Sequence, residues 1–109
     1  MNTALNSTIP LTETAPHLRL DQCAKGAQAR VVALLPQPLF GAQDDGVTQR
    51  LKELGFLPGA KLAVIGFGLM GSDPMAVHIN GTKFALRRAE AAKIRVEMLD
   101  ADGRTNLDN

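Results

Sequence analysis

The sequence predicts a small, mostly β domain with some α structure: an antiparallel barrel of about five strands with one main helix and short helical turns. Three observations indicate this fold class. Apolar residues alternate with polar ones on both sides of Asn80-Gly81, the strongest short-range sign of a β-hairpin, because both residues tolerate positive φ. Further short apolar runs lie between glycines and prolines. Only residues 44–54 have the period of an amphipathic helix, and parallel strands would need more helices to connect them.

Composition limits the class of protein. The chain has 109 residues, 45% of them hydrophobic, so one domain with a small core is expected. A single cysteine excludes a disulfide framework within the chain and fits a reducing compartment. No apolar run approaches the roughly 18 residues of a membrane span, and residues 1–16 lack the features of a signal peptide. We therefore expect a cytoplasmic protein without membrane insertion. The formal net charge of +1 argues against a nucleic-acid partner, because such proteins carry a basic excess.

The first part of the chain is expected to contain little regular structure. Residues 1–16 are polar and interrupted by prolines, which predicts a flexible tail. Residues 20–26 are predicted to form one capped helical turn that begins at Asp21 and ends at Gly26. Residues 29–35 form a compact apolar run and predict the first buried strand.

The main helix has recognisable ends. Its start is expected at Asp44 or Asp45, because a short carboxylate can accept hydrogen bonds from the free N–H groups of the first turn. Its end is expected at Gly55, which suits the left-handed residue that closes a helix, and Pro58 prevents the helix from resuming. Its apolar face, at spacings of four and three residues, consists of Val47, Leu51 and Leu54.

The second half of the chain is predicted to be mostly strands. A closed barrel would remove the exposed sheet edges that so short a chain could not otherwise cover. The expected elements are a strand over 61–65, a glycine-rich loop over 66–74, hairpin strands over 75–79 and 82–86, a short helical turn over 88–92, a last strand over 94–98 and a polar tail over 100–109.

Residues 66–71 match the pattern Gly-x-Gly-x-x-Gly, which in dinucleotide-binding proteins places backbone against pyrophosphate at a helix N-terminus. Here a proline and a predicted strand follow, so the required helix is missing. The sequence also contains no Gly-x-x-x-x-Gly-Lys-Ser/Thr phosphate loop. A hairpin loop is therefore a better interpretation of this segment than a nucleotide site.

The candidate metal ligands, apart from scattered carboxylates, are His17, Cys23 and His78. They do not stand at the short spacings that define a metal site, and His78 alternates with apolar neighbours, so it is expected to face outward. We predict no metal or other cofactor bound within one chain. A divalent metal held between two molecules is the alternative, and self-association of the chain stays open.

Neither a catalytic group nor a basic patch stands out. No serine or cysteine has an evident base nearby, and the carboxylates are not paired, so we expect a protein that is not an enzyme. Four basic residues lie among alanines and a glutamate in the second half of the chain and are interpreted as a solvated face. They are Lys83, Arg87, Arg88 and Lys93.

Leu57, Leu69 and Met70 are candidates for a contact surface. These large apolar residues lie in predicted turns, which the core of a small barrel does not reach, and an apolar patch of this kind can mark a partner surface. For Leu69 and Met70 an equally good alternative is that they fold back over the end of the barrel.

Several short motifs follow one another in a fixed order between Leu20 and Leu99. They are Arg50-Leu51-x-x-Leu54-Gly55-Phe56-x-Pro58-Gly59, Gly71-x-Asp73-Pro74-Met75, Asn80-Gly81, Phe84-Ala85-Leu86-Arg87-Arg88, and Glu90-Ala91 followed by Ile94-x-Val96.

In these motifs the chain resembles the FeoA family, the small cytoplasmic components of bacterial ferrous-iron uptake systems. The resemblance implies a five-stranded SH3-like barrel with a helix beside it, over residues 17–99, with tails over 1–16 and 100–109. It also implies a partner, the FeoB membrane iron transporter, whose cytoplasmic domain hydrolyses GTP. Similar barrels form the C-terminal module of iron-dependent repressors. This chain lacks the helix-turn-helix and the metal-binding domain that precede the barrel in those proteins, which disfavours a repressor.

Two functions follow as expectations. The first is a non-enzymatic accessory module that docks on the cytoplasmic G-protein domain of a FeoB-type transporter. The second is a metal sensor or carrier for iron or zinc, with a site assembled between subunits. For the first function the expected contact residues are Leu57, Leu69 and Met70, framed by the basic residues Arg87 and Arg88.

Overall fold

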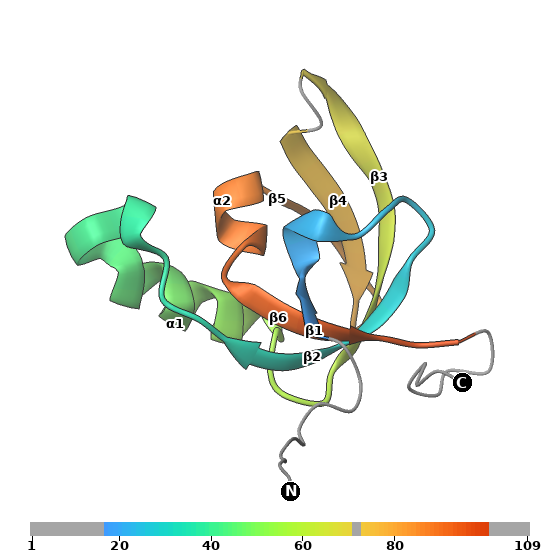
Figure 1. Ribbon diagram of the computed structural model, residues 1–109, viewed down its shortest axis with the longest axis horizontal. Coiled ribbons are helices and arrows are strands. Elements are labelled where there is room, and N and C mark those ends of the chain that lie inside the picture. The colour runs from blue at the N-terminus through green and yellow to red at the C-terminus, as the bar shows by residue number, and fades with distance from the viewer. Residues whose placement is uncertain (1–16, 71–72, 101–109) are drawn as a thin grey trace, which may run out of the picture.

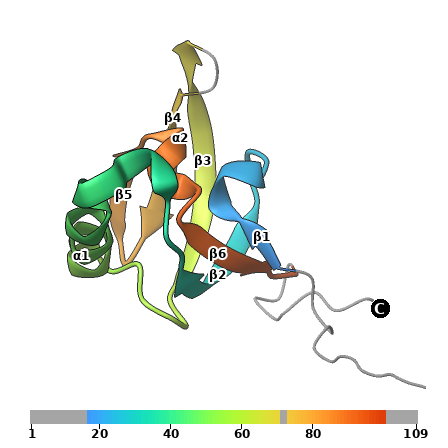
Figure 2. The same cartoon turned by 60° about the vertical axis from the view of Figure 1, so that its left-hand side comes forward.

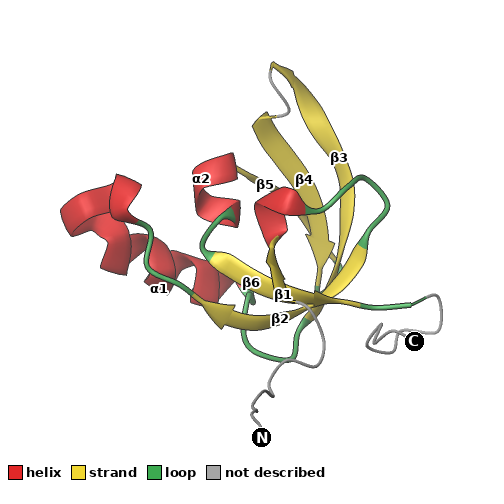
Figure 3. Cartoon of the chain, in the orientation of Figure 1, coloured by secondary structure: helices red, strands yellow, loops and turns green. Residues whose placement is uncertain are grey.

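The computed structural model describes residues 17–70 and 73–100, which form one antiparallel sheet with helices packed beside it (Figure 1). The order of strands in the sheet is β1-β6-β2-β3-β4-β5. The predicted fold class, mostly antiparallel β with one main helix, is confirmed (Figure 3). Within the described residues the elements are β1 (His17–Arg19), η1 (Leu20–Gln22), β2 (Gln28–Leu34), η2 (Pro38–Gln43), α1 (Asp44–Leu54), β3 (Lys61–Met70), β4 (Asp73–Ile79), β5 (Thr82–Leu86), α2 (Arg88–Ala91) and β6 (Ile94–Met98).

The described residues contain six strands rather than about five, and the additional one is β1. This strand has three residues and pairs with β6, with Leu18 opposite Val96. So short a segment cannot display a hydrophobic alternation, which explains why the sequence did not predict it. Among the described strands β1 and β5 are the two edges of the sheet, and they are not paired with each other. The predicted barrel thus keeps two edge strands among the described residues, and only the expected removal of exposed sheet edges is not met.

The β4–β5 hairpin is formed as predicted. Asn80 and Gly81 have φ values of 54° and 77°, the positive values that a two-residue hairpin turn requires. Ile79 pairs with Thr82 beside the turn. The apolar residues of β4 face the core, since Val77 is fully buried, while His78 is exposed as predicted.

The predicted loop over 66–74 is wrong. β3 continues to Met70 and β4 begins at Asp73, so most of that segment is strand. The register shifts between Val64 and Gly66, which is the irregularity that a glycine tolerates within a strand. At Gly68 a Cβ atom would lie 2.9 Å from the carbonyl oxygen of Asp73, so glycine permits a close approach of backbone there. Residues 66–70 are strand, and the next described element is strand β4 rather than a helix, which removes the structural context of a dinucleotide site.

The main helix ends as predicted and begins differently. Gly55 has φ of 109° and its N–H bonds the carbonyl groups of Leu51 and Lys52. At the other end, neither Asp44 nor Asp45 is the cap, because the short 3-10 helix η2 leads directly into α1 through Gln43. The carboxylate of Asp44 instead accepts a hydrogen bond from the N–H of Gln37, with its Oδ1 3.1 Å away.

Helix α1 lies against one side of the barrel (Figures 1 and 2). Leu51 is fully buried, while Val47 and Leu54 pack against the core with part of their surface exposed. Just beyond the helix, the rings of Phe56 and Phe84 have centroids 6.0 Å apart. The core that α1 covers includes Leu20, Val31, Val64, Met75, Ile79, Leu86, Ile94 and Val96.

The predicted helical turn over 20–26 is two separate turns. The 3-10 helix η1 covers Leu20–Gln22, with Arg19 as its cap residue. Gly26, with φ of 89°, belongs to a following turn in which the N–H of Ala27 bonds the carbonyl of Ala24. Cys23 lies between the two turns with 5% of its surface exposed, so it serves as a small core residue.

Candidate partner-binding surface

Leu57 lies in the turn that connects α1 to β3, and 47% of the residue's surface is exposed. The turn is rigidly held, because the N–H of Leu57 bonds the carbonyl of Gly55 and its own carbonyl accepts from the N–H of Ala60. The N–H of Gly59 also bonds Val31 in β2. The exposed leucine is thus presented by a fixed backbone, which favours a contact role over a flexible loop.

Leu69 and Met70 lie at the tip of the long β3–β4 hairpin. The backbone of Met70 pairs with that of Asp73, and the tip extends away from the rest of the sheet at the top of Figure 1. The positions of these two side chains lie outside the described part of the structure. Of the two predictions for this pair, a contact surface and a cover over the barrel end, neither is decided.

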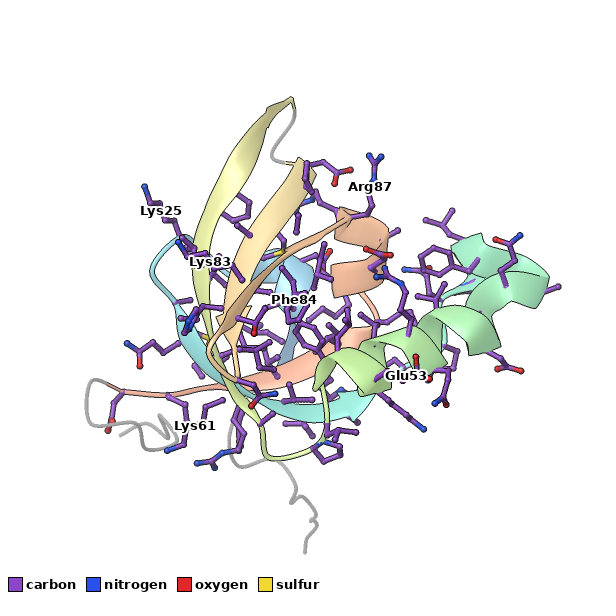
Figure 4. The ribbon with its side chains drawn as sticks, turned by 180° about the vertical axis from the view of Figure 1, so that it is seen from behind. Lys25, Glu53, Lys61, Lys83, Phe84 and Arg87 are labelled. Carbon is purple, nitrogen blue, oxygen red and sulfur yellow. The ribbon has the colours of Figure 1, made fainter. Side chains whose placement is uncertain are left out.

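Arg87 and Arg88 stand at the junction of β5 and α2 and differ in their surroundings. Arg87 is exposed, and its backbone N–H bonds the Glu90 side chain at 2.9 Å (Figure 4). Arg88 is half-buried: its N–H bonds Oδ1 of Asp73 at 3.1 Å and its guanidinium bonds the carbonyl of Asp21 at 2.9 Å. Arg88 therefore ties α2 to β4 and η1, and Arg87 is the more accessible cation.

The five predicted contact residues do not form one patch. Met70 and Arg88 both lie next to Asp73, at the start of β4. Leu57 follows Gly55, where a Cβ atom would meet the side-chain amide of Asn80 just beyond the other end of β4. A strand of seven residues is roughly 20 Å long, so the hairpin tip and Leu57 are at opposite ends of the molecule.

A hollow of about 550 Å³ lies beside Arg88 and was not predicted. It is lined partly by Leu35 and Leu39 and partly by Arg19, Asp21 and Arg88. Leu39 is 79% exposed, although it is a large apolar residue. The volume of this hollow lies in the range of small-molecule sites, but it is more open and more polar than such sites usually are. The sequence does contain a signal for this hollow: the large apolar residue Leu39 stands between a proline and a phenylalanine, in the segment that connects the first predicted strand to the main helix.

Lys93, predicted on a solvated face, is fully buried, so that prediction is wrong. Its Nζ lies 2.5 Å from Oδ1 of Asp44 and donates to the carbonyl of Leu35 at 3.0 Å. The hydrogen bond from Lys93 lowers the pKa of Asp44 below its ordinary value, and the N–H of Gln37 acts in the same direction against the opposing effect of burial. The pair fixes the start of α1 and the segment before it, which carries Leu39.

The candidate metal ligands are dispersed over the fold. His17 is in β1 and His78 is in β4, and three strands of the sheet lie between these two. Cys23 is buried, with Sγ 3.8 Å from the carbonyl of Arg19, and burial raises the pKa of its thiol, which disfavours the thiolate that binds metals. Among residues 17–70 and 73–100 no three histidine, cysteine, aspartate or glutamate side chains form a group that could hold a metal ion.

None of the described helices is long and apolar enough to cross a membrane. Among solved structures, FeoA of Stenotrophomonas maltophilia is 30% identical, with a TM-score of 0.62 over 79% of this chain and 93% of that one. That protein is complexed with zinc and is described as a procaryotic SH3 domain protein, suggested to act as a bacterial ferrous iron transport activating factor. FeoA of Chlorobium tepidum is 34% identical, with a TM-score of 0.64 over 78% of this chain and 73% of that one.

One further likeness concerns the fold alone. A manganese-dependent transcriptional repressor is 20% identical, with a TM-score of 0.64, and 79% of this chain matches 44% of that one. A search of curated proteins finds no match. The family model of the FeoA domain matches residues 18–98, most of the chain, and the SH3-like description of its relative agrees with the fold expected from the sequence. The chain belongs to the FeoA family.

Proposed function

We propose that this protein is a cytoplasmic, non-enzymatic accessory module of ferrous-iron transport, which docks on the cytoplasmic G-protein domain of a FeoB-type transporter. The observation that carries the proposal is the FeoA domain match over residues 18–98. A role in ferrous-iron transport is also supported by the relative from Stenotrophomonas maltophilia, whose description suggests that it acts as a ferrous iron transport activating factor. We propose that residues 17–99 form the folded domain of this module and that residues 1–16 and 100–109 are tails.

The proposed contact region is the end of the molecule where β4 starts. It combines the hairpin-tip residues Leu69 and Met70 with Arg87, which is exposed, and with Arg88, which positions α2 there. The exposed Leu39 extends this region across the hollow beside Arg88. Leu57 would contact a partner only if the partner also reaches the other end of the barrel, so we assign it a separate, smaller contact.

The experiment is a pull-down of the transporter's soluble G-protein domain with the full chain, with and without GTP. Leu69→Asp combined with Met70→Asp should weaken capture, and Arg87→Glu should weaken it further if charge contributes. Lys61→Glu is the matched control, because this exposed lysine begins β3 at the opposite end. Normal capture by the folded double variant would refute the tip as a contact. Unchanged ferrous-iron uptake after deletion of the gene would refute the transport role itself.

The second candidate function is binding of a divalent metal between two chains, as in the sequence-based alternative. The zinc-complexed relative from Stenotrophomonas maltophilia favours it. Of the candidate donors, the exposed His78 is accessible to a second chain, whereas Cys23 is buried. Anaerobic calorimetry with iron(II) and zinc(II) tests it: stoichiometric binding that His78→Ala abolishes supports the site, and absence of binding at micromolar metal refutes it.

A further inference from the structure

The edge of β5 has free hydrogen-bonding capacity. Among the described strands, β5 pairs with β4 alone, and β4 is the only element with which it makes extensive backbone contacts. Thr82, Lys83 and Ala85 are exposed. An edge strand presents N–H and C=O groups to which another strand can pair.

The register shows which groups point outward. A two-residue turn is flanked by a hydrogen-bonded pair, here Ile79 and Thr82, and bonded pairs then recur at every second residue. The N–H and C=O groups of Lys83 and Ala85 therefore point away from β4. The next outward N–H, that of Arg87, already bonds the Glu90 side chain, so the available edge ends there.

Helix α1 makes no extensive backbone contact with this strand among the described residues. Phe56, just beyond the end of α1, has a ring contact with Phe84, and Phe84 alternates with Lys83 and Ala85, so its side chain faces the core. Figure 4 shows Lys83, Phe84 and Arg87 along the strand and its end. The other edge, β1, offers only three residues. The edge of β5 is thus the better template for an added strand.

The charge around this edge selects the kind of partner. Lys83 lies opposite His78, and Arg87 follows the strand; all three are exposed. The one carboxylate in β4 and β5 is that of Asp73, which is engaged by the N–H of Arg88. The carboxylate of Glu90, just beyond the strand, is engaged by the N–H of Arg87 and by the guanidinium of Arg50. Lysine on an edge discourages pairing with a second copy, because the same charge would be repeated on both sides. An acidic strand meets no such penalty.

We propose that the edge of β5 is a further interaction surface, which binds an extended acidic segment of another protein by strand addition. Main-chain bonds to Lys83 and Ala85 hold the segment, and its carboxylates lie beside Lys83 and Arg87. This surface adjoins the contact region of the proposed function at Arg87, but its main-chain groups at Lys83 and Ala85 lie outside that region, and it does not depend on the identity of that partner.

The probe is a ten-residue synthetic peptide in which glutamate alternates with threonine and valine, added to the isotopically labelled full chain. We expect saturable shifts of the backbone amide signals of Lys83 and Ala85 and slower hydrogen exchange at these two amides. A peptide with proline at every second position, which cannot pair, should leave both unchanged. A peptide with lysine in place of glutamate should bind more weakly.

Two variants separate the main-chain and charge contributions. Ala85→Pro removes an outward N–H at an edge, where proline is tolerated, and should weaken binding about tenfold, whereas Ala85→Val should not. Lys83→Glu should weaken binding about two- to tenfold, and Arg95→Glu, the same charge change on β6, should not. Thermal melts establish that each variant is folded.

Three results would overturn the proposal. The first is no saturable binding at millimolar peptide. The second is binding without protection of the two amides or without sensitivity to Ala85→Pro. The third is sedimentation that shows a dimer of the chain, lost in Ala85→Pro, because a second copy would then occupy the edge.

Discussion

The Nζ atom of Lys93 lies 2.5 Å from Oδ1 of Asp44, and this ion pair joins the start of α1 to the residue that precedes β6. The two partners differ in burial: the Lys93 side chain is fully buried, whereas 20% of the Asp44 side chain is exposed. Lys93 also donates to the carbonyl of Leu35. The pair therefore orders the whole segment between β2 and α1, on which the exposed Leu39 is carried.

The unequal burial predicts unequal effects of substitution. Asp44→Asn leaves the fully buried charge of Lys93 without its counter-ion, and loss of the partner of a buried charge is strongly destabilising. Lys93→Met leaves a carboxylate that still reaches water, so its effect should be smaller. Urea unfolding of both variants measures the free energies. Equal losses would contradict the proposed asymmetry, and the double variant should recover part of the loss from Asp44→Asn.

The same pair predicts how stability depends on pH. Because the pKa of Asp44 is lowered in the folded state, its contribution is complete above the ordinary aspartate pKa of about 3.9 and is lost as pH falls through the lower folded value. Unfolding should therefore be measured from pH 7 to pH 2.5 in the wild type and in Asp44→Asn. The difference between them should be constant near neutrality and shrink in acid; a constant difference throughout would refute the linkage.

The features predicted correctly are local ones. Asn80-Gly81 and Gly55 adopt positive φ because turn and helix-end geometry depend on a few neighbouring residues. Gly66 and Gly68 predict a loop because glycine usually marks one. Gly66 instead lies at a register shift within β3, and at Gly68 the approach of Asp73 from the next strand requires glycine, a neighbour that a single sequence does not reveal.

Contacts between residues far apart in the sequence also limit how much of the candidate site can be predicted. Lys93 resembles a surface residue in sequence because it is charged and follows a glutamate and two alanines, and only its pairing with Asp44 explains the burial. Likewise, Leu57 and Met70 were grouped by their apolar character, although β4 separates them. The contact residues Leu57, Leu69, Met70, Arg87 and Arg88 therefore stay a prediction that binding experiments must decide.

The helix face offers a test of packing. Leu51 is fully buried and Leu54 only partly so, although both were predicted to anchor α1 on the barrel. Leu51→Ala should cost about 2–5 kcal/mol, the usual range for a fully buried leucine, and Leu54→Ala should cost less. Urea unfolding measures both losses in unfolding free energy, provided that the dependence of this free energy on urea concentration is the same in the variants as in the wild type. If Leu54→Ala proves as costly as Leu51→Ala, the orientation of α1 on the barrel is different from the one described here.

The end of α1 gives a matched pair of glycine substitutions. Gly55 has φ of 109°, and an added Cβ atom would meet the side-chain amide of Asn80, so Gly55→Ala should lose about 1–2 kcal/mol for the backbone alone. Gly46, in the first turn of the same helix, has open space around it, so Gly46→Ala should gain up to about 1 kcal/mol. Thermal unfolding should therefore move in opposite directions in the two variants. Because both substitutions change the unfolded chain alike, a shift of the same sign in both would refute the left-handed helix end at Gly55.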